Sequence, residues 1–376
     1  MLNEARLFRL FEDLCAINAP PLMESDCVSF ARRFLADNGL EVWEDDAGKR
    51  LGGNANNLIA KLPANSAGAP SIFFSAHFDT VEPTAGLEIE LRDDVYYSKS
   101  DTILGADDKA GMAPAIEAVL SVKEAKEPHG DVYLVLSVAE EIGLKGAFAC
   151  EIESLGVDFG YVFDTGPPVG SFVTKVGTQD KIHALVKGKP AHAGKDPEHG
   201  INAIQAAAAG IAKMRVGRLD GDTTANVGLI SGGTATNVVP AEVAFWMEAR
   251  SMNLADLDAQ VEHMIACVQE GAKQYGATAE ISKQRMYEGY DIPKEKSVVQ
   301  IGLEAASNLG FDFPLRCTLG GSDANAFNAK GVPTIVAGTG MKEIHTHDEH
   351  VAKKDLVDLA RLAVEIIRVS SRSARP

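Results

Sequence analysis

Residues 71–83, SIFFSAHFDTVEP, pass from an apolar segment directly into His77, Phe78, Asp79 and Thr80. The apolar part predicts a buried β-strand, and this strand ends on two side chains, His77 and Asp79, that can bind or orient a metal ion. In an α/β sheet, functional residues lie beyond the carboxyl ends of the strands. The stretch therefore predicts both a fold class and the edge of the sheet where a site should lie.

The segments after it continue the same rhythm. A helix is predicted at residues 111–125, and apolar strands are predicted at residues 131–139 and 159–164. Near the end of the chain, a further apolar segment and a helix at residues 353–370 resume the pattern. This alternation predicts an α/β fold with a mixed, mostly parallel sheet that is flanked by helices.

The middle of the chain has a different pattern. Residues 180–188 and 242–251 alternate polar and apolar side chains, which is typical of antiparallel strands with one exposed face. We therefore predict an inserted α+β lid domain at residues 176–288, within a discontinuous catalytic domain formed by residues 1–175 and 289–376.

Composition narrows the class of protein. The chain has 376 residues and a formal net charge of −17, which argues against nucleic acid as a partner. No apolar run approaches the roughly 18 residues that a membrane helix needs, so no membrane partner is expected. The five cysteines are scattered without CxxC spacing, which indicates a reduced, cytoplasmic protein.

Other side chains that can bind a metal ion lie at the ends of predicted strands or in the loops between predicted elements. They are Glu140 and Glu141 after residues 131–139, Asp164 at the end of residues 159–164, Asp107 and Asp108 just before the helix at 111–125, and His345 in EIHTHDEHV. Singly, each has an ordinary explanation, since an acidic pair is usually solvated and a lone histidine is usually structural. Their shared position after strands, in apolar contexts, favours a site.

So many carboxylates in one cleft would repel one another unless cations neutralise them. Imidazoles together with carboxylates suit zinc, with cobalt or manganese as substitutes. The donors are too many for one tetrahedral ion, so we predict two metal ions that share a carboxylate. Two ions about 3.5–4 Å apart can hold a bridging water and lower its pKa towards about 7. One of the adjacent Glu140 and Glu141 can then bind metal while the other accepts the proton of the water.

Several motifs resemble those of the zinc-dependent exopeptidases that include peptidase T, glutamate carboxypeptidases, aminoacylases and succinyl-diaminopimelate desuccinylase. In order, they are HFDTV, ILGADDKAGMA, AEEIGLKGA, FDTG and IHTHDEHV. The segments GKPAHAGKDPEHGINAI, GLISGGTATNVVP and GGSDANAF are similar to the peptidase T-like, or tripeptidase, branch in particular. The resemblance covers nearly the whole chain.

This resemblance implies a role for each residue of the site. The metal ligands would be His77 and Asp164 for one zinc ion, Glu141 and His345 for the other, and Asp107 as the bridge between them. Asp79 would orient His77, and Glu140 would be the general base that activates the bridging water and then protonates the leaving amine. The family also implies a cis peptide bond between Asp107 and Asp108.

For the lid, the resemblance implies contacts with substrate. His192 would help to stabilise the tetrahedral oxyanion, and Asn237 and Arg250 would contact the backbone or carboxylate of the substrate. The simpler alternatives are a surface ion pair for Arg250 and a loop position for His192. By analogy with relatives, the lid could also pair with a second copy to form a homodimer.

The expected function is that of a metal-dependent exopeptidase acting on short peptides, most specifically a tripeptide aminopeptidase that uses a metal-bridging hydroxide. The same dinuclear zinc site could instead serve a carboxypeptidase or dipeptidase, an N-acyl-amino-acid deacylase, or a binding protein without turnover. A serine hydrolase is disfavoured because no GxSxG elbow follows a strand, and a dinucleotide enzyme because GxGxxG is missing.

Overall fold

A computed structural model of the protein describes residues 2–373 and 375. The chain forms two compact units, each with a hydrophobic core of its own. Unit 1 comprises Met1–Lys175, Asp291–Cys317 and Ser322–Pro376, whereas unit 2 comprises Val176–Tyr290 and Thr318–Gly321. The second boundary thus falls two residues after the expected one, and a four-residue segment from later in the chain also belongs to unit 2.

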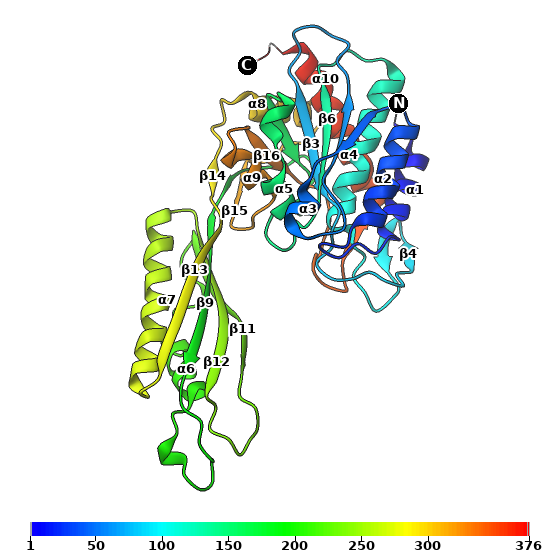
Figure 1. Ribbon diagram of the computed structural model, residues 1–376. Coiled ribbons are helices and arrows are strands. Elements are labelled where there is room, and N and C mark those ends of the chain that lie inside the picture. The colour runs from blue at the N-terminus through cyan, green and yellow to red at the C-terminus, as the bar shows by residue number, and fades with distance from the viewer. Residues whose placement is uncertain (1, 374, 376) are drawn as a thin grey trace. The chain divides into compact units, whose positions relative to one another are not determined.

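Unit 1 is built on a nine-stranded sheet, whose main path is β1-β2-β6-β3-β7-β16-β8-β14. In that order the strands are Glu41–Glu44, Leu58–Leu62, Val132–Ser137, Ile72–His77, Phe159–Val162, Thr334–Ala337, Phe172–Val176 and Tyr290–Asp291, and β15 (Arg316–Thr318) pairs with β8. Figure 1 labels β3, β6, β16 and β14 of this sheet. The four inner strands β6, β3, β7 and β16 are parallel, while β2 and β8 are antiparallel to their inner neighbours. The mixed α/β class with a mostly parallel centre is therefore confirmed.

Helices cover both faces of this sheet (Figure 1). Phe73 and Phe74 are consecutive on β3, so their side chains point to opposite faces. Phe74 joins the large core formed with α1 (Glu4–Cys15), α4 (Ala106–Ala125) and α10 (Lys353–Arg372). Phe73 packs edge-on against Phe327 of α9 (Asp323–Ala329), with ring centroids 5.1 Å apart. The remaining helices of unit 1 are α2 (Ser25–Asp37), α3 (Ala47–Leu51), α5 (Lys145–Ala149), η1 (Ile152–Leu155) and α8 (Ser297–Asn308).

The start of α4 depends on a glycine. Asp107 and Asp108 have non-helical dihedral angles, so regular helix begins only after them, as expected for residues in a loop just before a helix. A Cβ atom on Gly111 would lie 2.0 Å from the carbonyl oxygen of Phe163 and 2.4 Å from Asp108 Oδ1. Glycine at this position therefore lets the first turn of α4 approach the end of β7, which brings the Asp107 and Asp164 segments together.

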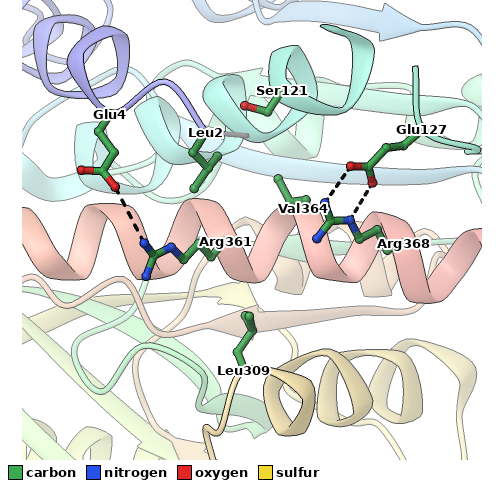
Figure 2. A pocket seen from close by; sticks show the side chains of 8 residues that line it. All are labelled: Leu2, Glu4, Ser121, Glu127, Leu309, Arg361, Val364 and Arg368. Atoms are coloured by element: carbon green, nitrogen blue, oxygen red, sulfur yellow. Dashed lines mark hydrogen bonds and ion pairs between the residues drawn. The ribbon is translucent and has the colours of Figure 1, made fainter. Parts of the chain in front are cut away.

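Ion pairs fasten α10 to its neighbours at the other end of α4 (Figure 2). Arg361 lies 3.7 Å from Glu4 of α1, and Arg368 lies 2.6 Å from Glu127, which follows α4. The two pairs flank a cavity of about 370 Å³ that Ser121 and apolar side chains also line. Because roughly 20 Å of helix separates Ser121 from Asp107, this cavity lies away from the carboxyl edge of the inner strands.

Unit 2 is a five-stranded antiparallel sheet in the order β10-β11-β12-β9-β13. Its strands are Gly217–Arg218, Thr223–Gly232, Glu242–Ser251, Thr178–Lys187 and Thr278–Tyr287 in that order. The helices α6 (Ala203–Ile211) and α7 (Leu254–Gln274) pack on each other and on the sheet, and η2 (Pro197–His199) precedes α6. The alternating burial along β9 agrees with a sheet covered on one face.

One small sheet of unit 1 has no counterpart in the elements predicted from sequence. It has the order β17-β5-β4, formed by His350–Ala352, Val95–Ser98 and Ile89–Arg92. Its strands are too short for a clear two-residue pattern. Among the helices of residues 2–373, none combines the length and the hydropathy that a bilayer span requires.

Candidate metal centre

The carboxyl edge of the inner strands collects the polar residues of unit 1. His77 is the last residue of β3, Glu140 and Glu141 follow β6, and Asp164 follows β7. Asp107 stands at the start of α4, and His345 comes from the loop that precedes β17. The parallel register of β6, β3 and β7 puts the first three segments side by side.

The carboxylate of Asp107 lies between two imidazoles. Its Oδ1 is 3.3 Å from His77 Nε2, and its Oδ2 is 3.3 Å from His345 Nε2. Glu141 Oε1 approaches the same nitrogen of His345 at 3.2 Å. Each oxygen of Asp107 therefore faces a different donor group, which is the arrangement of a bridging carboxylate.

These donors fit two divalent cations. Two candidate ligand groups at this edge are His77–Asp107–Asp164 and Asp107–Glu141–His345. A third, His77–Glu140–Glu141, overlaps both, and within each group the ligand atoms lie within 4.8 Å of one another. Two donors on one tetrahedral zinc ion, with bonds of about 2.0–2.1 Å, are roughly 3.3 Å apart. The three nitrogen–oxygen separations given above have this length. Within the described residues, the buried atoms Asp107 Oδ1 and Glu141 Oε1 have no hydrogen-bond partner, so both are free to bind an ion.

The pKa shifts of the side chains also indicate a site for cations. Burial and the neighbouring acids, Asp164 among them, raise the pKa of Glu140 well above its usual value, despite the opposing effect of His77. Burial lowers the pKa of His77, but its contacts with Asp107 and Asp79 outweigh burial and raise that pKa. Contacts with Asp107 and Glu141 raise the pKa of His345 to about 10. These pKa values are raised because the clustered acids have too little positive charge near them. Metal cations would supply that charge.

Asp79 connects His77 to the two glutamates. Its main-chain oxygen lies 2.9 Å from His77 Nδ1, and its carboxylate Oδ1 lies 3.6 Å from the same nitrogen. The two carboxylate oxygens accept hydrogen bonds from the main-chain N–H groups of Glu140 (2.9 Å) and Glu141 (3.0 Å). The carboxylate thus acts chiefly on the backbone of the glutamates, and the carbonyl of Asp79 is the nearer partner of the imidazole.

The expected cis peptide bond between Asp107 and Asp108 is present. The buried Asp108 accepts a hydrogen bond from the main-chain N–H of His77 at 3.3 Å. His345 has a positive φ of 63°, a conformation that histidine adopts more readily than most residues.

Two buried acids near the centre were not assigned a role from the sequence. Glu349 accepts hydrogen bonds from the N–H groups of Gly105 (2.6 Å) and Asp107 (2.9 Å), and burial raises its pKa to about 7. Asp323 accepts a hydrogen bond from the hydroxyl of Ser137, and burial raises its pKa to about 6. Both lie inside motifs that carry the family resemblance, IHTHDEHV and GGSDANAF. Because the neighbouring residues are equally polar, the sequence does not distinguish Glu349 and Asp323 from them.

The three residues expected in the lid all belong to unit 2. His192 is exposed and its Nδ1 accepts a hydrogen bond from the N–H of Gly194, while Ala193 donates to the carbonyl of the exposed Asn237. His192 and Asn237 therefore lie on adjoining segments. Arg250 lies on β12, where it pairs with Glu248 at 2.9 Å and donates to the carbonyl of Leu319 at 3.2 Å.

Comparisons with known proteins decide the family. Residues 179–276 match the model of the peptidase dimerisation domain, and residues 57–154 match that of peptidase family M28. The uncharacterised protein YqjE of Bacillus subtilis is 38% identical over 372 residues, which are 99% of this chain and all of that protein. Crystal structures of a tripeptidase from Staphylococcus aureus and of the aminopeptidase PepT from Bacillus cereus superpose with TM-scores of 0.92 and 0.87. Each is 38% identical and aligns over 99% of this chain and 100% of its own.

The chain belongs to the peptidase T-like branch of the M20 peptidases. It is therefore a metal-dependent exopeptidase, and the resemblance noted in its sequence is confirmed. The dimerisation-domain match falls within unit 2, and the M28 match falls within unit 1 and covers His77, Asp107, Glu140 and Glu141. The alternative activities that could use the same site have no better support among the relatives.

The contacts of Glu349 predict that it stabilises the metal centre of this M20 peptidase. In Glu349→Gln, an amide NH₂ would face one of the two main-chain N–H groups, so the Asp107 segment would lose one of its anchors. We expect the metal affinity to fall by roughly 10–100-fold, as for other groups that hold ligands in place. Competition with a chromogenic chelator measures this affinity. The exposed neighbour provides the control, Asp348→Asn, and an unchanged affinity in a folded Glu349→Gln protein would contradict the prediction.

Proposed function

We propose that the protein is a zinc-dependent aminotripeptidase, which removes the N-terminal residue of tripeptides. The observation that carries the proposal is the Asp107 carboxylate, with one oxygen 3.3 Å from each of two imidazole nitrogens. The tripeptide preference rests on the similarity to a tripeptidase and to an aminopeptidase over 99% of this chain. Zinc is favoured over other divalent ions because the donors are imidazoles and carboxylates at separations suited to its short bonds.

The proposed ligands are His77, Asp107 and Asp164 for one ion, and Asp107, Glu141 and His345 for the other. The two candidate donor groups that contain Asp107 correspond to this division. When bound, the two cations would polarise the scissile carbonyl and acidify the attacking water. The chain itself orients these ligands, through Asp79 for His77 and through Glu349 for the Asp107 segment.

Glu140 is proposed as the general base. It is buried, and its Oε2 lies 4.0 Å from His77 Nε2, so it borders the donor atoms. It shares a candidate group with His77 and Glu141, but it belongs to neither of the groups that contain the bridging Asp107. A buried carboxylate beside the donor atoms is placed to accept a proton from the attacking water. In this role, Glu140 takes a proton from the attacking water and returns it to the amine that leaves.

His192, Asn237 and Arg250 are proposed to contact the substrate. The exposure of His192 and Asn237 on adjoining segments supports a shared binding surface. Arg250 suits a carboxylate because its planar fork can bind both oxygens. Since Glu248 already occupies this fork in the structure, a substrate carboxylate would have to displace Glu248.

We also propose that unit 2 pairs with a second copy of the chain. From Asn226 onwards β11 has β12 on one side, whereas β10 pairs only with Thr224 and Ala225. Leu229 and Ile230 on this open stretch are 66% and 56% exposed. An open edge with apolar side chains favours pairing with another strand. The proposed location is the cytoplasm, because the five cysteines are all free thiols, four of them buried.

Substitution of the two adjacent glutamates should separate their roles. We expect Glu140→Gln to bind two metal ions with near-normal affinity while kcat falls by roughly 10²–10⁴, because only the proton transfer is lost. Glu141→Gln should lose affinity for one ion, since an amide is a poor zinc ligand. Metal analysis and steady-state kinetics on a tripeptide measure both effects. Near-normal turnover by Glu140→Gln would remove it from the role of base.

A substrate panel tests the aminotripeptidase assignment. The purified zinc-loaded protein should release the N-terminal residue of a free tripeptide and should act poorly on the same tripeptide with an acetylated amine. Dipeptides and N-acyl amino acids are the matched comparisons, and product analysis identifies the bond that is cut. Preferred release of the C-terminal residue would instead indicate a carboxypeptidase, and preferred cleavage of N-acyl amino acids would indicate a deacylase.

Light scattering of the purified chain tests the pairing of unit 2. We expect a dimer for the parent protein and a monomer for the double variant Leu229→Lys, Ile230→Lys, because two charges would stand at the open edge of β11. Leu91→Lys in unit 1 changes an equally apolar residue that is 45% exposed and should leave the dimer intact. A monomeric parent protein at micromolar concentration would overturn the proposal.

A further inference from the structure

The turn that carries Glu140 and Glu141 is held by side chains from distant parts of unit 1. Where β6 ends, the N–H of Val138 donates to Asn57 Oδ1 at 3.0 Å, and the next N–H, of Ala139, donates to Glu24 Oε1 at 2.9 Å. The two following N–H groups donate to the carboxylate of Asp79, as described above. Four consecutive amides are therefore fixed by three side chains, of which Glu24 is the most distant in sequence.

The backbone of this turn needs support because Ala139 has a positive φ of 55°. A residue with a Cβ atom disfavours this conformation, at a cost that the surroundings must offset. The chain bends directly before Glu140, and the carbonyl of Glu140 then accepts from the N–H groups of Gly143 and Leu144. A change at Ala139 would therefore change the direction in which Glu140 and Glu141 leave the strand.

Glu24 is a buried acid at the start of a helix. It lies just before α2, its side chain is 1% exposed, and no basic side chain within residues 2–373 forms an ion pair with it. The same oxygen, Oε1, accepts the N–H groups of Leu22 (2.9 Å) and Ala139, and Oε2 has no hydrogen-bond partner among the described residues. A buried carboxylate without a cation is costly. Main-chain N–H groups, those of Leu22 and Ala139 among them, offset this cost.

The loop that presents Glu24 is itself fixed to the site. The carbonyl of Ala19 accepts from the N–H of Thr80, which follows His77 and Asp79, and Asn18 Oδ1 accepts from the N–H of Thr84 at 2.7 Å. The N–H of Asn54 donates to the carbonyl of Leu22 at 3.0 Å. This loop therefore reaches both the segment after β3 and, through Glu24, the segment after β6.

From these contacts we propose that Glu24 is a positioning residue for hydrolysis, which fixes the amide of Ala139 and thereby aims Glu140 and Glu141 at the reaction site. The inference rests on the proposed role of Glu140 and goes beyond it. Glu24 acts through the main chain of the turn and touches none of the reacting atoms.

Substitutions of Glu24 in the full-length, zinc-loaded protein test this role. Glu24→Ala should lower kcat by roughly 10–100-fold, the scale of a misplacement near 1 Å, with KM within about twofold. Amide hydrogen exchange in residues 138–145 should become faster. Glu24→Gln should restore most of kcat, because an amide oxygen can accept the same two N–H groups. Glu24→Asp keeps the charge but is shorter by one methylene, so kcat should fall again.

The matched control is Asp26→Ala, which removes an exposed acid two residues away and should leave kcat and exchange unchanged. Wild-type kcat and exchange in a folded Glu24→Ala protein would overturn the proposal, and so would a Glu24→Gln variant as slow as Glu24→Ala. If Glu24→Ala does not fold, the contrast between Glu24→Gln and Glu24→Asp decides. If the parent protein does not cleave tripeptides, the proposed function fails, while the exchange in residues 138–145 still tests whether Glu24 holds the turn.

Discussion

Repulsion among buried carboxylates is the constraint on which the rest of unit 1 depends. Asp107 lies between two imidazoles, and further acids lie next to it on the same edge of the sheet. Without added positive charge this crowding would oppose folding. Several local features make sense as means of keeping the acids in place: Gly111 admits the first turn of α4, Asp79 binds two main-chain amides, and Glu349 binds two more. The sheet brings the ligand segments together, and these contacts set their orientation.

Much of this arrangement follows from simple sequence patterns. Long apolar segments gave the inner strands, because a parallel strand covered on both faces is apolar throughout. His77, Glu140 and Asp164 could then be grouped, since the ends of parallel strands share one edge of the sheet. His345 could not be grouped with them in this way, because it comes from a loop and not from a strand end. Only the motif around His345 linked it to the other residues of the site. In unit 2, the strands β9 and β12 follow from the alternation of polar and apolar residues at 180–188 and 242–251.

Three buried acids near the site could not be identified from the sequence, and two of them act on main-chain amides. Glu24 and Glu349 each bind N–H groups that lie more than a hundred residues away, and no local pattern marks an acid with this function. Asp323 lies at the start of a short helix, where an acid is common for other reasons. The strands β4, β5 and β17 were missed because each is three or four residues long and pairs with a segment that is distant in sequence or equally short.

The order of the proposed ligands along the chain decides when the metal centre can form during synthesis. His77 precedes all of unit 2, whereas His345 follows it. A ribosome must therefore synthesise the entire inserted unit before the last imidazole of the site exists. Under the proposed assignment, a nascent or prematurely terminated chain carries most of the acids but cannot assemble the pair of metal sites. Hydrolytic activity would then arise only after His345 has been synthesised, when most of the chain is complete.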